Sequence, residues 1–130
     1  MPSLPARLPW KQLGDPDPAH EYLIVLTYLP VKRLYHLPRF FFYTRMVQRQ
    51  LDAAPTGLAG YSMAARPFRS RYWTLTAWDD AVAVGAFISK PPHRNAMKHT
   101  TSLATFRSIR WVLPGHALPP TWGDALTRAQ

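Results

Sequence analysis

The sequence predicts one α+β domain whose elements follow the order strand, helix, strand, strand, helix, strand. Three observations lead to this prediction. Three segments are rich in β-branched and aromatic residues, one segment places apolar residues at three- and four-residue intervals, and prolines gather towards both ends of the chain. The 130 residues, of which 47% are hydrophobic, suffice for one compact core and are too few for two domains of ordinary size.

Both ends of the chain are predicted to be arms outside the domain. Residues 1–20 contain prolines at positions 2, 5, 9, 16 and 18. Prolines remove backbone donors and hold the chain extended, so we expect neither a helix nor a central strand there. Trp10 is the expected anchor of this arm. The domain then spans residues 21–113, and residues 114–130 form a second proline-rich arm.

The domain is predicted to open with a strand and a helix. Residues 22–29 are apolar at odd and even positions alike, which is typical of a strand covered on both faces. Residues 38–54 begin with a proline, which suits the first turn of a helix. Their apolar positions share one helical face: Phe40, Tyr43, Val47 and Leu51.

A strand hairpin is predicted to follow the first helix. Residues 58–65 place Tyr61 and Met63 on one face and small residues on the other, and Gly60 leaves room for a close approach by another group. Residues 71–78 give the strongest strand pattern in the chain, and we expect them to pair antiparallel with residues 58–65.

The second half ends with a helix and a last strand. Asp79 or Asp80 is a suitable N-cap for a helix that must stop before Pro91 and Pro92. The last strand is expected at residues 103–112.

This order is that of the ferredoxin-like split βαβ fold, written βαββαβ. Right-handed crossovers place both helices on one face of an antiparallel four-stranded sheet, so the other face stays bare. We therefore expect a homodimer in which two such faces pack together, as in the dimeric α+β barrels.

Composition excludes several classes of function. The chain has no cysteine, which rules out disulfides, thiolate nucleophiles and thiolate metal sites. No apolar run is long enough to span a membrane, and the first residues do not resemble a secretory signal, so a cytoplasmic location is expected. The net charge of +9 would attract anions, but the basic residues are dispersed along the sequence. Their densest group, "RPFRSR", is interpreted as a solvated turn, which argues against a nucleic-acid surface.

The segment "YWTLTAWDDAVAVGAFISKPPHRNAM" resembles the antibiotic-biosynthesis-monooxygenase superfamily of dimeric α+β barrels. The stretch "GLAGYSMAARPFRSRYWTLTAWDD" resembles, more narrowly, the spheroidene-monooxygenase-like branch. The resemblance covers about residues 20–113. It matches Trp78 to the tryptophan at a strand end and His93 to the histidine of a Pro-His turn.

The same resemblance bears on haem. Haem-degrading relatives have three functional residues that can be matched to this sequence. Their iron-ligating histidine corresponds to Met97, and the tryptophan that distorts the haem corresponds to Phe87. Their asparagine corresponds to Thr27 or Tyr28. All three positions differ here, which argues against haem degradation by that route. Members of the spheroidene-monooxygenase-like branch are regarded as haem-dependent, so the resemblance leaves two cofactor states open, none or haem with His93 as ligand.

The candidate site residues are weighed as follows. His93 could act as general acid or base, or bond a nearby carbonyl at a helix end. Tyr61 and Tyr28 could each place a hydroxyl in an apolar cavity and act in catalysis. The expected substrate-binding residues are Trp73, Trp78, Phe87, Arg94 and Met97. For the aromatics and Met97 the alternative is core or dimer packing, and for Arg94 an exposed position.

Three functions are compatible with these residues. The first is a monooxygenase-like enzyme that acts on a hydrophobic aromatic or polyene small molecule. The second is a non-oxidative cyclase, isomerase or dehydratase of the same fold. The third is a non-catalytic ligand-binding or structural dimer.

Overall fold

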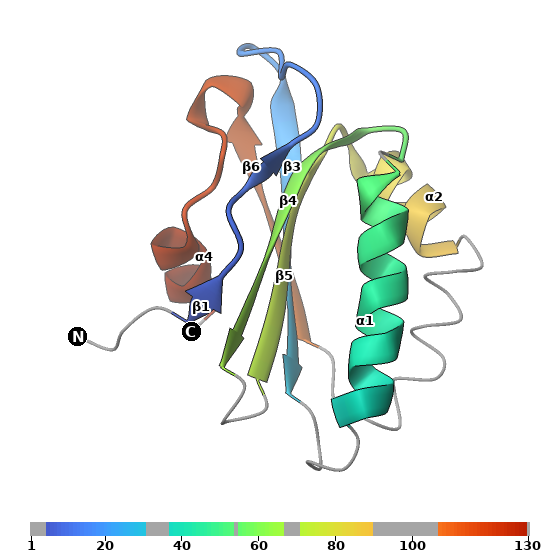
Figure 1. Cartoon of the computed structure of the whole chain (residues 1–130). Coiled ribbons are helices and arrows are strands. Elements are labelled where there is room, and N and C mark those ends of the chain that lie inside the picture. Colours follow the sequence, from blue (N-terminus) through green and yellow to red (C-terminus); the bar gives the residue numbers. More distant parts are fainter. Residues whose placement is uncertain (1–4, 31–36, 54, 67–70, 90–106, 130) are drawn as a thin grey trace.

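The computed structural model in Figure 1 describes residues 5–30, 37–53, 55–66, 71–89 and 107–129. Four long strands form the centre of the fold. In chain order they are β3 (Glu21–Pro30), β4 (Leu58–Arg66), β5 (Arg71–Trp78) and β6 (Arg107–Pro114).

These four strands lie side by side in the order β4-β5-β3-β6, and each neighbouring pair is antiparallel. Leu26 in the middle of β3 faces Leu75 on one side and Ile109 on the other. This order, in which the first and third long strands lie at the centre, is that of the predicted α+β ferredoxin-like fold. The predicted pairing of residues 58–65 with residues 71–78 is confirmed. The last strand is described from Arg107, so the predicted start at residue 103 lies outside the described residues.

Helices α1 (Leu37–Asp52) and α2 (Ala81–Ser89) lie on the same side of the sheet (Figure 1). The prediction of two helices on one face is therefore confirmed. The Oδ1 atom of Asp80 accepts a hydrogen bond of 2.9 Å from the backbone N–H of Ala83, which makes Asp80 the cap of α2. No helix in the described ranges combines the length and the apolar character needed to cross a membrane.

The N-terminal segment adds two short strands to the sheet edge. β1 (Ala6–Arg7) and β2 (Lys11–Gln12) both pair with β4. An edge position tolerates the neighbouring prolines because one side of an edge strand needs no backbone donors. Between the two strands, the ring of Trp10 lies over Gly60, where a Cβ atom would come within 2.6 Å of it. Trp10 thus anchors the segment to the sheet, and the absence of a side chain at Gly60 leaves room for the Trp10 ring.

The C-terminal segment, predicted as a second proline-rich arm, contains regular structure. After a 3-10 turn, η3 (Gly115–Ala117), it forms helix α4 (Trp122–Arg128). Thr121 caps this helix by accepting from the N–H of Asp124 at 3.2 Å, and the basic Arg128 lies in the last turn. The prolines end just before this capped stretch, so they limit the helix without preventing it.

Helix α4 lies on the side of the sheet away from α1 and α2 (Figure 1). It buries Trp122 and Ala125 in a cluster with residues of all four long strands. The expectation of a wholly bare sheet face is therefore wrong, because the chain covers much of that face with its own C-terminus. We call this side of the sheet the α4 face.

Candidate functional site

An apolar and aromatic layer lies between the sheet and the helices α1 and α2. We call it the inner layer, and its buried members are Val25, Leu51, Leu58, Tyr61, Trp78, Val84 and Phe87. Trp78, at the end of β5, is only 2% exposed. Its ring centroid is 5.1 Å from that of Phe87 on α2. Two of the predicted substrate-binding residues are thus in contact.

The polar groups next to Trp78 bond to one another. The indole Nε1 of Trp78 donates to Oγ1 of Thr76 at 2.7 Å, and that hydroxyl lies 3.5 Å from the carbonyl oxygen of Val25, to which it donates. Since these groups are satisfied internally, the surface around Trp78 presents mainly carbon to its surroundings. Such a surface suits an apolar ligand better than a charged one.

Tyr61 reaches from the inner layer to a charged group at the end of α1. Its hydroxyl donates to Oδ1 of Asp52, and Nζ of Lys11 binds the same oxygen at 2.7 Å. Burial, followed by the hydrogen bond and charge of Asp52, raises the pKa of Tyr61 to about 12. The hydrogen bonds from Lys11 and then Tyr61 lower the pKa of Asp52. A phenol with so high a pKa is a poor base at neutral pH.

Gln50 adds an unusual polar group on α1. Its side-chain oxygen and nitrogen are both shielded from solvent and have no hydrogen-bond partner among the described residues. Gln50 lies one turn beyond Val47, which packs against the inner layer, so the two share a helix face. A buried amide without partners costs free energy, and it could bond to a polar atom of a ligand.

Tyr28 and Trp73 lie on the α4 face and not in the inner layer. They face each other across β3 and β5, with ring centroids 5.3 Å apart and planes 25° from parallel. The structure therefore separates them from Tyr61, Trp78 and Phe87, with which sequence reasoning had grouped them. Because β3 is apolar at both odd and even positions, the pattern did not show which side chains share a face.

The remaining predicted site residues, His93, Arg94 and Met97, lie outside the described residues. The roles suggested for them stay predictions.

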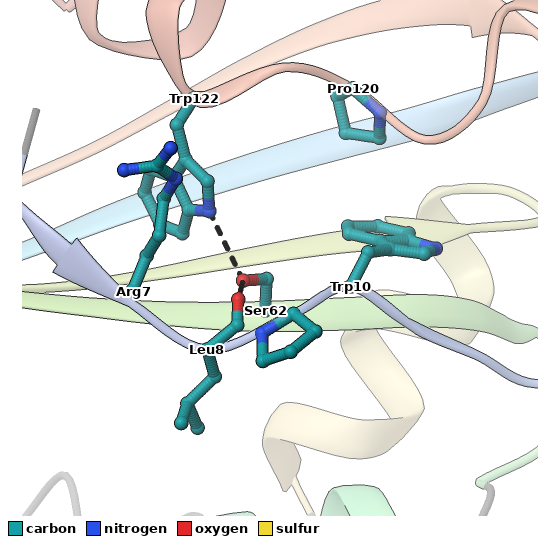
Figure 2. A pocket seen from close by; sticks show the side chains of 7 residues that line it. Arg7, Leu8, Trp10, Ser62, Pro120 and Trp122 are labelled. Atoms are coloured by element: carbon teal, nitrogen blue, oxygen red, sulfur yellow. Dashed lines mark hydrogen bonds between the residues drawn. The ribbon is translucent and has the colours of Figure 1, made fainter.

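A hollow opens on the α4 face, where the N-terminal and C-terminal segments meet (Figure 2). It has a volume of about 360 Å³ and is lined by Arg7, Leu8, Pro9, Trp10, Ser62, Pro120 and Trp122. The hydroxyl of Ser62 donates to the carbonyl oxygen of Leu8 at 2.7 Å and accepts from Nε1 of Trp122 at 3.1 Å. Sequence reasoning missed this pocket because it placed both segments outside the domain, although it expected Trp10 to anchor the first of them. The one sequence signal for the pocket was a tryptophan in each segment, Trp10 and Trp122.

Within the described ranges, His, Asp and Glu side chains do not gather in the groups of three or more that a metal ion would need. His20 is exposed and bonds to the carbonyl oxygen of Asp79 through Nε2 at 2.9 Å, and His116 is exposed after β6. Neither of these two imidazoles belongs to the inner layer. The described residues therefore offer no histidine ligand for a haem placed there.

No protein-family model matches the chain, and no curated protein is similar to it in sequence. Solved structures nevertheless share its fold. A protein from Lactobacillus acidophilus NCFM, assigned by name as a monooxygenase, superposes with a TM-score of 0.63 at 9% identity. The match covers 85% of this chain and 52% of that protein, so the chain spans about half of its length.

Two further structures match over most of their own length. One, from Nitrosomonas europaea, bears the name of an antibiotic biosynthesis monooxygenase and has a TM-score of 0.61, 17% identity and coverage of 79% of this chain and 95% of the other. The other is a mutant of SnoaB, a cofactor-independent oxygenase from Streptomyces nogalater, with a TM-score of 0.54, 16% identity and coverage of 78% and 100%. At such identities the likeness shows the fold, that of the antibiotic-biosynthesis-monooxygenase-like structures. The spheroidene-monooxygenase-like branch stays a prediction.

Proposed function

We propose that this protein is an oxygenase-like enzyme that acts on a hydrophobic aromatic or polyene small molecule held against the inner layer. The observation that carries the proposal is the contact of Trp78 with Phe87 in a layer whose neighbouring hydroxyls are bonded internally. An apolar substrate placed beside Trp78 would leave neither the Trp78 indole N–H nor the Thr76 hydroxyl unpaired, because the two already bond to each other and to Val25. The fold shared with structures named as monooxygenases supports the proposal.

His93 is the proposed base. It would remove a proton from an activated carbon of the substrate, and the resulting electron-rich carbanion would react with dioxygen to form a hydroperoxide. Loss of water from that hydroperoxide leaves a carbonyl group, so no external reductant is needed. Gln50 would bond to a substrate oxygen, because its shielded amide has no partner among the described residues. Tyr61 is assigned to structure, because its hydroxyl is bound to Asp52.

Oxygen uptake tests this proposal directly. With a panel of polycyclic phenols and conjugated polyenes, we expect one dioxygen consumed per product formed by protein without added cofactor. His93→Ala should lower kcat by about 100-fold or more, the size expected for loss of a general base. The matched control is His99→Ala, which removes the other imidazole of the same sequence segment.

Three results would contradict the proposal. Turnover without oxygen would favour the non-oxidative cyclase, isomerase or dehydratase. Uptake that requires added haem, together with a Soret band lost in His93→Ala, would favour haem ligation. Equal activity of the two histidine variants would remove His93 from the mechanism.

The predicted homodimer is a separate question. Its physical reason was a bare sheet face, and α4 together with Trp10 now packs over Ile24, Leu26, Leu75 and Ala77 on that face. The expected bare face is thus largely covered, and the homodimer stays a prediction. We propose that one copy of the chain carries the complete site.

A further inference from the structure

One row of side chains crosses the α4 face from edge to edge. Direct register places Arg7 of β1 opposite Ala64, Ala64 opposite Trp73, Trp73 opposite Tyr28, and Tyr28 opposite Arg107 of β6. Residues in direct register point to the same face of a sheet. With neighbouring strands about 4.8 Å apart, the row is roughly 19 Å long. We call it the aromatic row.

The aromatic row lies where the cover provided by α4 ends. Leu26 and Leu75, which follow on the same face, are 1% and 0% exposed, whereas Tyr28 and Trp73 keep part of their surface in solvent and Arg7 and Arg107 are exposed. The two stacked rings therefore form an accessible aromatic platform with a guanidinium at each end.

More positive charge lies beside this platform. Arg66 and Arg71 face each other in the next pair on the same face, so four arginines surround two aromatic rings. Among the residues of the described strands the only acid is Glu21, at the far end of β3. Asp124 on α4 is paired with Arg128 at 2.8 Å. The potential at the aromatic row is therefore positive.

We propose that the aromatic row binds single-stranded nucleic acid. Bases would stack on Tyr28 and Trp73, and phosphates would bind Arg7, Arg71 and Arg107. Every base has a π-face and every nucleotide a negative charge, so this combination binds without strong sequence preference. Aromatic side chains on the open face of a four-stranded sheet are an established way to hold two or three bases.

A second copy of the chain is the competing occupant of this surface. A symmetric dimer places the same patch of both copies in one interface. The arginines that rim the row would then approach those of the partner, in a protein that already carries a net charge of +9. This repulsion favours an anionic partner over a second copy. The basic residues looked dispersed in the sequence because strand pairing, not sequence proximity, brings them together.

The test is fluorescence anisotropy with labelled oligouridine and oligothymidine of about ten nucleotides, a usual length for such sites. We expect the full chain to bind both, with the affinity falling as salt rises. Tyr28→Ala should weaken binding about tenfold, the loss of one base stack. The control for aromatic loss is Phe42→Ala, since Phe42 is 61% exposed on α1, on the other side of the sheet.

Two arginines of β6 allow a matched control for the loss of one positive charge. Arg107 belongs to the aromatic row, whereas Arg110 pairs with Val25 and points to the opposite face of β6. Arg107→Gln should weaken binding and lower the slope of log affinity against log salt by about 0.7, the value for one phosphate contact on a single strand. Arg110→Gln removes the same net charge and should leave the slope unchanged.

Several results would overturn the proposal. They are no binding of either oligonucleotide at low salt, equal effects of Arg107→Gln and Arg110→Gln, and a dimer that Tyr28→Ala converts to single copies. Trp73 packs against the buried cluster, so its truncation risks the fold. Trp73→Phe keeps an aromatic ring there, and its circular dichroism reports whether a loss of affinity is local.

Discussion

Tyr61 links ionisation to stability at alkaline pH. Its pKa is raised from 10.0 to about 12, so folding favours the neutral phenol. That stabilisation is fully present below pH 10.0 and is lost as the pH rises through about 12. We expect the difference in free energy of unfolding between the wild type and Tyr61→Phe, measured with urea, to change sharply only in this window.

Replacing the neighbouring Asp52 gives a second test of how the pKa of Tyr61 affects stability. Asp52→Asn removes the negative charge that adds to burial in raising the pKa of Tyr61. The alkaline loss of stability should therefore span a narrower range in Asp52→Asn, while burial keeps the pKa of Tyr61 above 10.0. Identical pH profiles for wild type and Tyr61→Phe would show that this hydroxyl does not ionise differently in the folded and unfolded chains.

Gly60 and Trp10 should behave as one unit. A methyl group at position 60 would lie 2.6 Å from the Trp10 ring, so Gly60→Ala must displace that ring from β4. We expect Gly60→Ala and Trp10→Ala each to lower the free energy of unfolding by about 1–3 kcal/mol. The double variant should cost little more than either, because the displaced ring can be lost only once. Additive costs in chemical unfolding would contradict this.

At the scale of elements, the side chain of Trp122 both packs α4 on the sheet and bonds it to β4. Trp122 is 7% exposed, and its Nε1 donates to Ser62. Trp122→Phe keeps most of the buried area and should cost about 1 kcal/mol for the lost hydrogen bond. Trp122→Ala should cost about 3–5 kcal/mol.

Thermal and chemical unfolding would measure both changes. Val82→Ala on α2 is the control, because Val82 is 79% exposed and its change should stay within about 0.5 kcal/mol. Equal stabilities of Trp122→Ala and Val82→Ala would mean that α4 does not pack on the sheet in solution.

The long elements could be predicted from sequence, and the short terminal ones could not. β5 and α1 each extend over enough residues for their spacing to identify them, and they end within two residues of the predicted limits. β1 and β2 have two residues each, too few for any periodicity, and their pairing with β4 is a tertiary event. α4 has only seven residues, too few to show a clear helical spacing. The prolines just before it therefore decided how the segment was interpreted.

For the whole molecule, the fold could be predicted while the grouping of site residues could not. The order of elements leaves few topologies, so the sheet order follows from it. Which side chains meet depends on the face each strand turns to the helices. Trp73 and Trp78 belong to the same strand, but they are five positions apart, an odd number, and therefore face opposite ways. The pocket between the two terminal segments also requires coordinates, because its walls are far apart in sequence.

The number of copies in solution is the prediction that belongs to the whole molecule. We expect sedimentation equilibrium to give a mass near the 14.9 kDa of one chain, because α4 covers the apolar part of the sheet face on which a partner would pack. Deleting residues 121–130 uncovers Ile24, Leu26 and Leu75, and the truncated chain should associate as its concentration rises, as large exposed apolar patches do. Ala125→Glu gives the same test at full length, since Ala125 is 0% exposed and a carboxylate there must push α4 off the sheet. A full-length mass of two chains that Ala125→Glu leaves unchanged would show that the copies associate without this face, and that α4 does not stand in for a partner.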